Sequence, residues 1–147
     1  MPNYIGRFIT DLRFQHPCAL LVSGTTGAGK SNFVKNVIER NGIKGNIRNI
    51  FYFMPKLETL DITPKVGVNI FYFAGLPDEQ FIRDNFKEST RDSLIIIDDQ
   101  WSAAIENEIV ANLAVYGRRH DGRSLIFITQ NGEEKAKRAI RRRDGGL

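Results

Sequence analysis

The fold of this chain is decided by the stretch Ala19-Leu20-Leu21-Val22-Ser23-Gly24-Thr25-Thr26-Gly27-Ala28-Gly29-Lys30-Ser31. The apolar run at 19–22 predicts a buried strand. Residues 32–39 predict a helix with one apolar face, made by Phe33, Val34, Val37 and Ile38. Between strand and helix, residues 24–31 follow the spacing G-x-x-x-x-G-K-[ST] in the context that this motif requires.

This spacing is that of the P-loop, or Walker A motif, which holds the phosphates of a nucleoside triphosphate such as ATP. Its glycines let successive backbone N–H groups point at one anion, and the following helix directs its positive end at the same phosphates. We expect Lys30 to reach the β- and γ-phosphates and the Ser31 hydroxyl to bind Mg²⁺. A glycine-rich turn without a ligand is the alternative. The predicted nucleotide-binding residues are Gly24, Thr25, Thr26, Gly27, Ala28, Gly29, Lys30, Ser31 and Asn32.

Length and composition indicate one globular domain over residues 1–147, since 41% of the chain is hydrophobic and 26% is charged. We expect an N-terminal arm or short helix at 1–16 and a basic C-terminal helix at 132–147. The N-terminus has no signal-peptide pattern, and the aliphatic run at 94–97 is too short to cross a bilayer. With Cys18 as its single cysteine, the chain is expected to be intracellular, not secreted and without membrane contact.

The net charge of +4 favours a polyanionic partner, and basic residues gather at 118–120 and 135–143. A solvated charged helix is an equally good interpretation of the second cluster.

Further strands are predicted at 50–53, 68–73, 93–99 and 124–129, with a loop at 55–67. A short helix after the N-cap Asp78 and a longer one at 103–116 alternate with them. No internal repeat is predicted. Buried strands alternating with helices imply an α/β fold around a parallel sheet.

Asp98 and Asp99 follow the run 94–97, as in a Walker B motif. A carboxylate at the carboxyl end of a central strand lies beside a P-loop, because open α/β sheets bind ligands there. We therefore predict that Asp98 acts on Mg²⁺, through water, and that Asp99 polarises the attacking water. The alternative for Asp99 is an N-cap of the next helix.

Three further residues are catalytic candidates. Gln130 ends the strand at 124–129, and its amide can donate to the γ-phosphate and accept from the attacking water. A polar residue at a strand end is the alternative. Arg118 and Arg119 can stabilise transition-state charge at a neighbouring subunit's nucleotide, although two loop arginines are more often solvated.

The segments 24–31, 94–99 and 128–130 together resemble the additional-strand P-loop ATPases, and among them the FtsK–HerA branch of DNA-pumping motors. The segment 117–131 (Gly-Arg-Arg-His-Asp-Gly-Arg-Ser-Leu-Ile-Phe-Ile-Thr-Gln-Asn) is similar to the genome-packaging ATPases of DNA viruses and virus-like transposons. Residues 51–55 and 68–77 are also similar to that group. The resemblance covers residues 18–131.

The resemblance implies a three-layer RecA-like fold with strand order 5-1-4-3-2, in which the strand bearing Gln130 separates the Walker A and Walker B strands. It also implies a homo-oligomeric ring, a pentamer or hexamer, around double-stranded DNA. Arg119 is the first choice for an arginine finger and Arg118 the second. A capsid vertex protein would be a further partner, in the infected host cell or in the virion.

Two features depart from that family pattern. Asp99 stands where many of these ATPases have glutamate. No strand is predicted within residues 132–147, so we expect the last strand of that fold to be absent from this segment. The edge beside the P-loop strand would then need a neighbour or the N-terminal arm to cover it.

Three functions are consistent with these patterns. The first is an ATP-hydrolysing DNA translocase that packages a viral genome. The second is a small P-loop phosphotransferase, in which residues 135–143 would act as a lid. The third is a nucleotide-gated interaction module without turnover. The Walker motifs fit ATP or GTP.

Overall fold

The computed structural model describes residues 14–23, 30–40, 42–86, 92–117 and 122–129. Within them, five strands form one all-parallel sheet in the order β2-β7-β6-β4-β5. These strands are β2 (Ala19–Ser23), β4 (Asn49–Met54), β5 (Asn69–Ala74), β6 (Ser93–Asp98) and β7 (Arg123–Thr129). A second, two-stranded parallel pair joins β1 (Phe14–Gln15) to β3 (Ile43–Lys44). The prediction of an α/β fold around a parallel sheet is confirmed.

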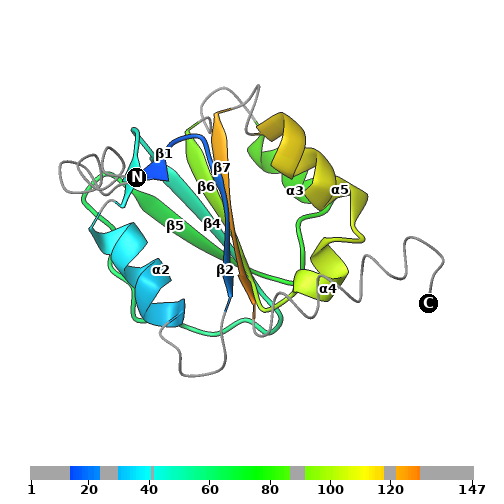
Figure 1. Ribbon diagram of the computed structural model, residues 1–147, viewed down its shortest axis with the longest axis horizontal. Helices are drawn as coiled ribbons and strands as arrows, with labels where there is room; N and C mark the ends of the chain where they lie inside the picture. The colour runs from blue at the N-terminus through cyan, green and yellow to red at the C-terminus, as the bar shows by residue number, and fades with distance from the viewer. Residues whose placement is uncertain (1–13, 24–29, 41, 87–91, 118–121, 130–147) are drawn as a thin grey trace, which may run out of the picture.

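Helices cover both faces of the sheet (Figure 1). One face carries α2 (Lys30–Glu39). The other carries α3 (Glu79–Asn85), α4 (Trp101–Ala104), α5 (Glu108–Asn112) and the π-helical turn η2 (Leu113–Gly117). The described residues therefore form three layers, with the sheet in the middle.

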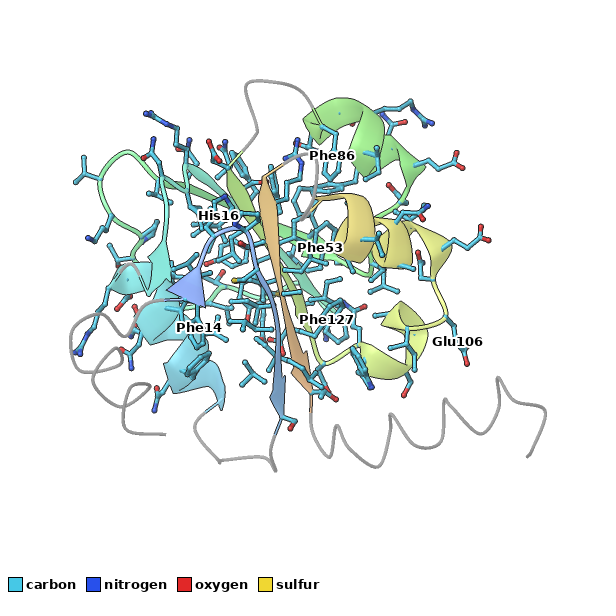
Figure 2. The ribbon with its side chains drawn as sticks, turned by 45° about the horizontal axis from the view of Figure 1, so that its top comes forward. Phe14, His16, Phe53, Phe86, Glu106 and Phe127 are labelled. Carbon is cyan, nitrogen blue, oxygen red and sulfur yellow. The ribbon has the colours of Figure 1, made fainter. Side chains whose placement is uncertain are left out.

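The core divides into two clusters because successive side chains of a strand point to opposite faces. Ile96 and Ile126 pack toward α2, whereas Ile95 and Leu125 pack toward α3, α4 and α5. These four side chains are at most 1% exposed. Figure 2 shows Phe53 and Phe127 on the side of the sheet that faces α4 and α5. The central strands are thus buried on both faces, as the aliphatic run at 94–97 predicts.

Strands β4 and β5 carry the same five-residue sequence, Asn-Ile-Phe-Tyr-Phe, at 49–53 and 69–73. They pair in parallel with each residue opposite its identical partner. The Phe53 and Phe73 rings stack with centroids 4.9 Å apart, and the Tyr52 and Tyr72 rings meet at a tilt with centroids 5.7 Å apart. The prediction of no internal repeat is therefore wrong.

The strand order differs in part from the order 5-1-4-3-2. Counted along the chain, the five strands stand in the order 1-5-4-2-3. β7 lies between β2 and β6, as the resemblance implies, but β5 lies at the sheet edge outside β4. The near-identical sequences of β4 and β5 carry no signal for which of them pairs with β6, so tertiary packing decides their places. Among the described residues, no strand pairs with the outer edge of β2.

The prediction of one continuous helix over residues 103–116 is wrong. The chain forms α4, α5 and η2 instead, because the Asn107 side chain starts a new helix. Its Oδ1 accepts hydrogen bonds from the N–H groups of Ile109 at 2.9 Å and Val110 at 3.1 Å. A side chain that bonds the backbone in this way caps a helix and interrupts the previous one.

The predictions for the two ends of the chain are tested only in part. Phe14 and Gln15 form β1, a strand, where an arm or short helix is predicted over 1–16. The rest of that arm and the basic helix at 132–147 lie outside the described residues. The N-cap prediction is confirmed, since Asp78 Oδ1 accepts from Phe81 N–H at 2.8 Å.

Candidate functional site

The carboxyl ends of β2, β7 and β6 meet at one edge of the sheet. Ser23 at the end of β2 pairs with Thr129 of β7, and Asp98 at the end of β6 pairs with Ile128. Because the strands are parallel and adjacent, Ser23, Asp98 and Thr129 lie at this same edge. The ends of the three strands next to the sequence motifs are therefore brought together.

The strand and the helix that flank the P-loop motif form as predicted. β2 ends at Ser23 and α2 begins at Lys30. Lys30 and Ser31 open the first turn of α2, where backbone N–H groups have no partner within the helix. Asn32 follows them with an exposed side chain. The loop residues Gly24, Thr25, Thr26, Gly27, Ala28 and Gly29 lie outside the described residues.

Asp98 lies on the sheet face that α2 covers. Leu94 and Ile96 of the same strand pack in the α2 cluster, and Asp98 follows them at the spacing of two that keeps side chains on one face. Its side chain is partly exposed at the strand end. This places the carboxylate on the side of the sheet that carries α2.

The Tyr52 hydroxyl of β4 donates a hydrogen bond to Oδ2 of Asp98 over 2.8 Å. Tyr52 is only 3% exposed. Burial raises the pKa of Tyr52 well above its ordinary value, and the negative charge of Asp98 raises it further. The Tyr52 hydroxyl is therefore neutral and keeps the proton that it donates to the Asp98 carboxylate.

Sequence reasoning missed Tyr52, although a signal for it exists. A tyrosine in a fully buried strand needs a hydrogen-bond partner for its hydroxyl. An aspartate at the end of another strand, such as Asp98, can supply one. The partner lies 46 positions along the chain, so only the pairing of β4 with β6 identifies it.

Asp99 leaves the strand in a left-handed backbone conformation, with φ of 55°. Its N–H donates to the Ile128 carbonyl over 2.8 Å, which extends the bonding between β6 and β7 by one residue. Its side chain is exposed. The N-cap of α4 is Gln100, so the alternative role of Asp99 as that cap is wrong.

The turn after Asp99 is anchored to the rest of the domain. Gln100 donates from its side-chain amide to the Gly75 carbonyl over 2.7 Å. The Trp101 ring packs edge-on against Phe127 with centroids 5.3 Å apart. These contacts hold the two residues that directly follow the aspartates.

Ser124, His16 and Asp92 line up at the opposite, amino edge of the sheet. The Ser124 Oγ lies 2.6 Å from His16 Nδ1, and His16 Nε2 lies 3.4 Å from Asp92 Oδ1. Cys18 N–H also donates to the Ser124 Oγ over 2.9 Å. Ser124 is fully buried, so its hydroxyl has no access to a substrate. We interpret this group as a structural link between β1, β2, β6 and β7.

The remaining predicted catalytic residues, Gln130, Arg118 and Arg119, lie outside the described residues. Thr129, the residue before Gln130 in the sequence, ends β7 at the edge where Asp98 lies. Among the described residues there is no cluster of three or more histidine, cysteine or acidic side chains fit to hold a metal ion. That part of the chain also has no helix of the length and hydrophobicity needed to cross a membrane.

Comparison of the chain with protein-family models, with curated proteins and with solved structures gives no match.

Proposed function

We propose that this chain is an ATP-hydrolysing motor of the additional-strand P-loop class that moves double-stranded DNA. Residues 24–32 would hold the nucleotide, Lys30 would contact its phosphates, and Asp99 would orient the attacking water. The sequence resemblance to genome-packaging ATPases suggests a viral genome as the cargo.

One observation supports this proposal over the phosphotransferase. β7 lies between the P-loop strand β2 and the Asp98 strand β6. P-loop kinases usually place those two strands side by side. An intervening strand is typical of the ATPases, where it carries a polar residue to the γ-phosphate, and Gln130 follows β7 directly.

The described residues are compatible with Mg²⁺ bound together with a nucleotide. In such sites Mg²⁺ takes few protein ligands and completes its shell with phosphate oxygens and water. Asp98 offers a partly exposed carboxylate on the α2 face of the sheet, and the helix bearing Ser31 starts at the same edge. Asp98 and Ser31 would hold the ion, which would neutralise phosphate charge.

The proposed motor is a ring, because the resemblance predicts that each site is completed by a neighbouring subunit. Arg119, or else Arg118, would reach the next subunit's nucleotide. The ring would enclose DNA, for which the net charge of +4 is suitable. A capsid vertex protein would anchor it.

The test is ATP hydrolysis by the purified chain, measured with and without double-stranded DNA. We expect DNA to stimulate hydrolysis. We expect Asp99→Asn to lower the rate by about 100-fold or more while nucleotide binding persists, because it removes only the carboxylate that orients water. Native mass measurement of the assembly should give a pentamer or hexamer.

Asp92→Asn is the matched control, since Asp92 shares the left-handed conformation, with φ of 57°, at the opposite edge of the sheet. Its variant should hydrolyse ATP at the wild-type rate. Full activity of Asp99→Asn would contradict the site assignment. Phosphate transfer to a nucleoside would favour the phosphotransferase, and binding without turnover would favour the interaction module.

A further inference from the structure

We propose that Tyr52 is a positioning residue that sets the orientation of the Asp98 carboxylate for a Mg²⁺–nucleotide complex. This inference rests on the proposed function. It assigns a role to a strand, β4, that carries none of the sequence motifs.

The pairing register explains why a tyrosine is needed at position 52. Tyr52 stands opposite Ile96, and Asp98 lies two residues further along β6 on the same face. Diagonal neighbours on one face of a sheet are about 7–8 Å apart, which a long aromatic side chain spans and a serine or threonine does not. The hydroxyl at the end of the ring reaches Oδ2 at 2.8 Å.

The Tyr52 ring is held in place by packing. It is buried in the cluster formed with α2, whose neighbours include Ile50 and Met54, and it contacts the Tyr72 ring at a centroid distance of 5.7 Å. A side chain locked in this way cannot swing with its hydrogen-bond partner. The hydrogen bond therefore restrains the Asp98 carboxylate, whereas the Tyr52 ring is already held by its packing.

A hydroxyl that donates to one oxygen of a carboxylate fixes the orientation of a group that binds hard cations such as Mg²⁺. Groups that orient a metal-binding carboxylate typically contribute about 10–100-fold to metal affinity. Removing the Tyr52 hydroxyl should thus weaken the response to Mg²⁺ without removing any contact to the nucleotide.

The experiment titrates Mg²⁺ into the full chain with a fluorescent ATP analogue, starting from EDTA. Tyr52→Phe keeps the ring and removes only the hydroxyl. We expect nucleotide binding in EDTA to be unchanged and the Mg²⁺ concentration at half-effect to rise by about 10-fold. ATP hydrolysis should need the same increase in Mg²⁺.

Tyr72→Phe is a closely matched control. Tyr72 has the same position in the repeated segment and stands directly opposite Tyr52, one strand further from Asp98. Its variant should titrate like the wild type. A Tyr52→Phe curve that coincides with the wild-type curve would overturn this inference alone. A wild-type chain that binds no nucleotide would overturn the proposed function with it.

A second measurement uses the wild-type sequence and does not depend on how well the variant folds. The chain has four tyrosines, which can be replaced by 3-fluorotyrosine and followed by fluorine NMR. With nucleotide present, adding Mg²⁺ should shift the Tyr52 resonance and leave that of Tyr72 in place. Equal responses of the two resonances would contradict a specific role for Tyr52.

Discussion

Asp99 shows how backbone conformation restricts the choice of residue at a candidate site. A left-handed residue other than glycine costs about 1–2 kcal/mol, and aspartate and asparagine are better tolerated there than longer side chains. With φ of 55°, position 99 suits aspartate better than glutamate. An aspartate at this position, with its shorter side chain, is thus consistent with the local geometry.

Replacement of Asp99 by glycine and by alanine should test this conformation. We expect Asp99→Gly to be more stable than Asp99→Ala by about 1 kcal/mol in urea unfolding, because glycine adopts a positive φ without strain. The exposed residue Asn36, inside α2, gives the opposite control. The Asn36→Ala variant should be more stable than Asn36→Gly by about 1 kcal/mol, because alanine favours a helix interior. If the alanine variant were more stable than the glycine variant at both positions, Asp99 would not be left-handed.

At the same scale, the sequence predicts Asp98 and Asp99 correctly as residues at a strand end but not Tyr52. The aspartates follow an aliphatic run, so their position is encoded locally. The Tyr52 contact depends on which strand lies beside β6 and on its register. Neither is determined by residues near Tyr52.

At the scale of elements, the break between α4 and α5 depends on one side chain. Asn107 bonds two backbone N–H groups and is followed by Glu108 in the first turn of α5. A polar capping residue followed by an acidic residue signals the start of a helix. Asn107 and Glu108 form this signal inside the range 103–116, which is predicted as one helix. The apolar positions Ile105, Ile109 and Leu113 are four apart, so their periodicity concealed it.

Asn107→Ala should lower the free energy of unfolding by about 1 kcal/mol, because two N–H groups at the start of α5 lose their acceptor. Asn107→Asp should retain most of the stability, since aspartate caps equally well. Asn112→Ala, at an exposed position of the same helix, is the control and should be neutral or slightly stabilising. Chemical denaturation measures all three. No loss in Asn107→Ala would show that α5 does not need this cap.

At the scale of the whole molecule, the central strands connect the two core clusters. Neighbouring residues of β7 serve opposite faces, with Ile126 in the α2 cluster and Leu125 in the cluster of α3, α4 and α5. Local sequence predicts the strands themselves, since each is an aliphatic or aromatic run. Their order is a property of the assembled sheet, so local sequence does not predict that β5 lies at its edge.

Ile126→Ala and Leu125→Ala should each cost about 3 kcal/mol and shift a single unfolding transition. Fluorescence of Trp101, the chain's one tryptophan, reports on the α4 side, so it should register Ile126→Ala although that change is on the α2 side. Leu21→Ala, at a side chain that is 47% exposed, is the control, with a cost of at most about 1 kcal/mol. If the unfolding transition followed by Trp101 fluorescence were unchanged in Ile126→Ala, the two core clusters would unfold separately.

The repeated segment at 49–53 and 69–73 also bears on how separate chains meet while they fold. Each copy of the segment already accepts the other as an in-register neighbour. In a partly folded population, the β4 segment of one chain can therefore pair with the β5 segment of another and keep every side chain on its native face. Such an exchange would link molecules through native contacts, a route to domain-swapped assemblies that competes with correct folding as the protein concentration rises.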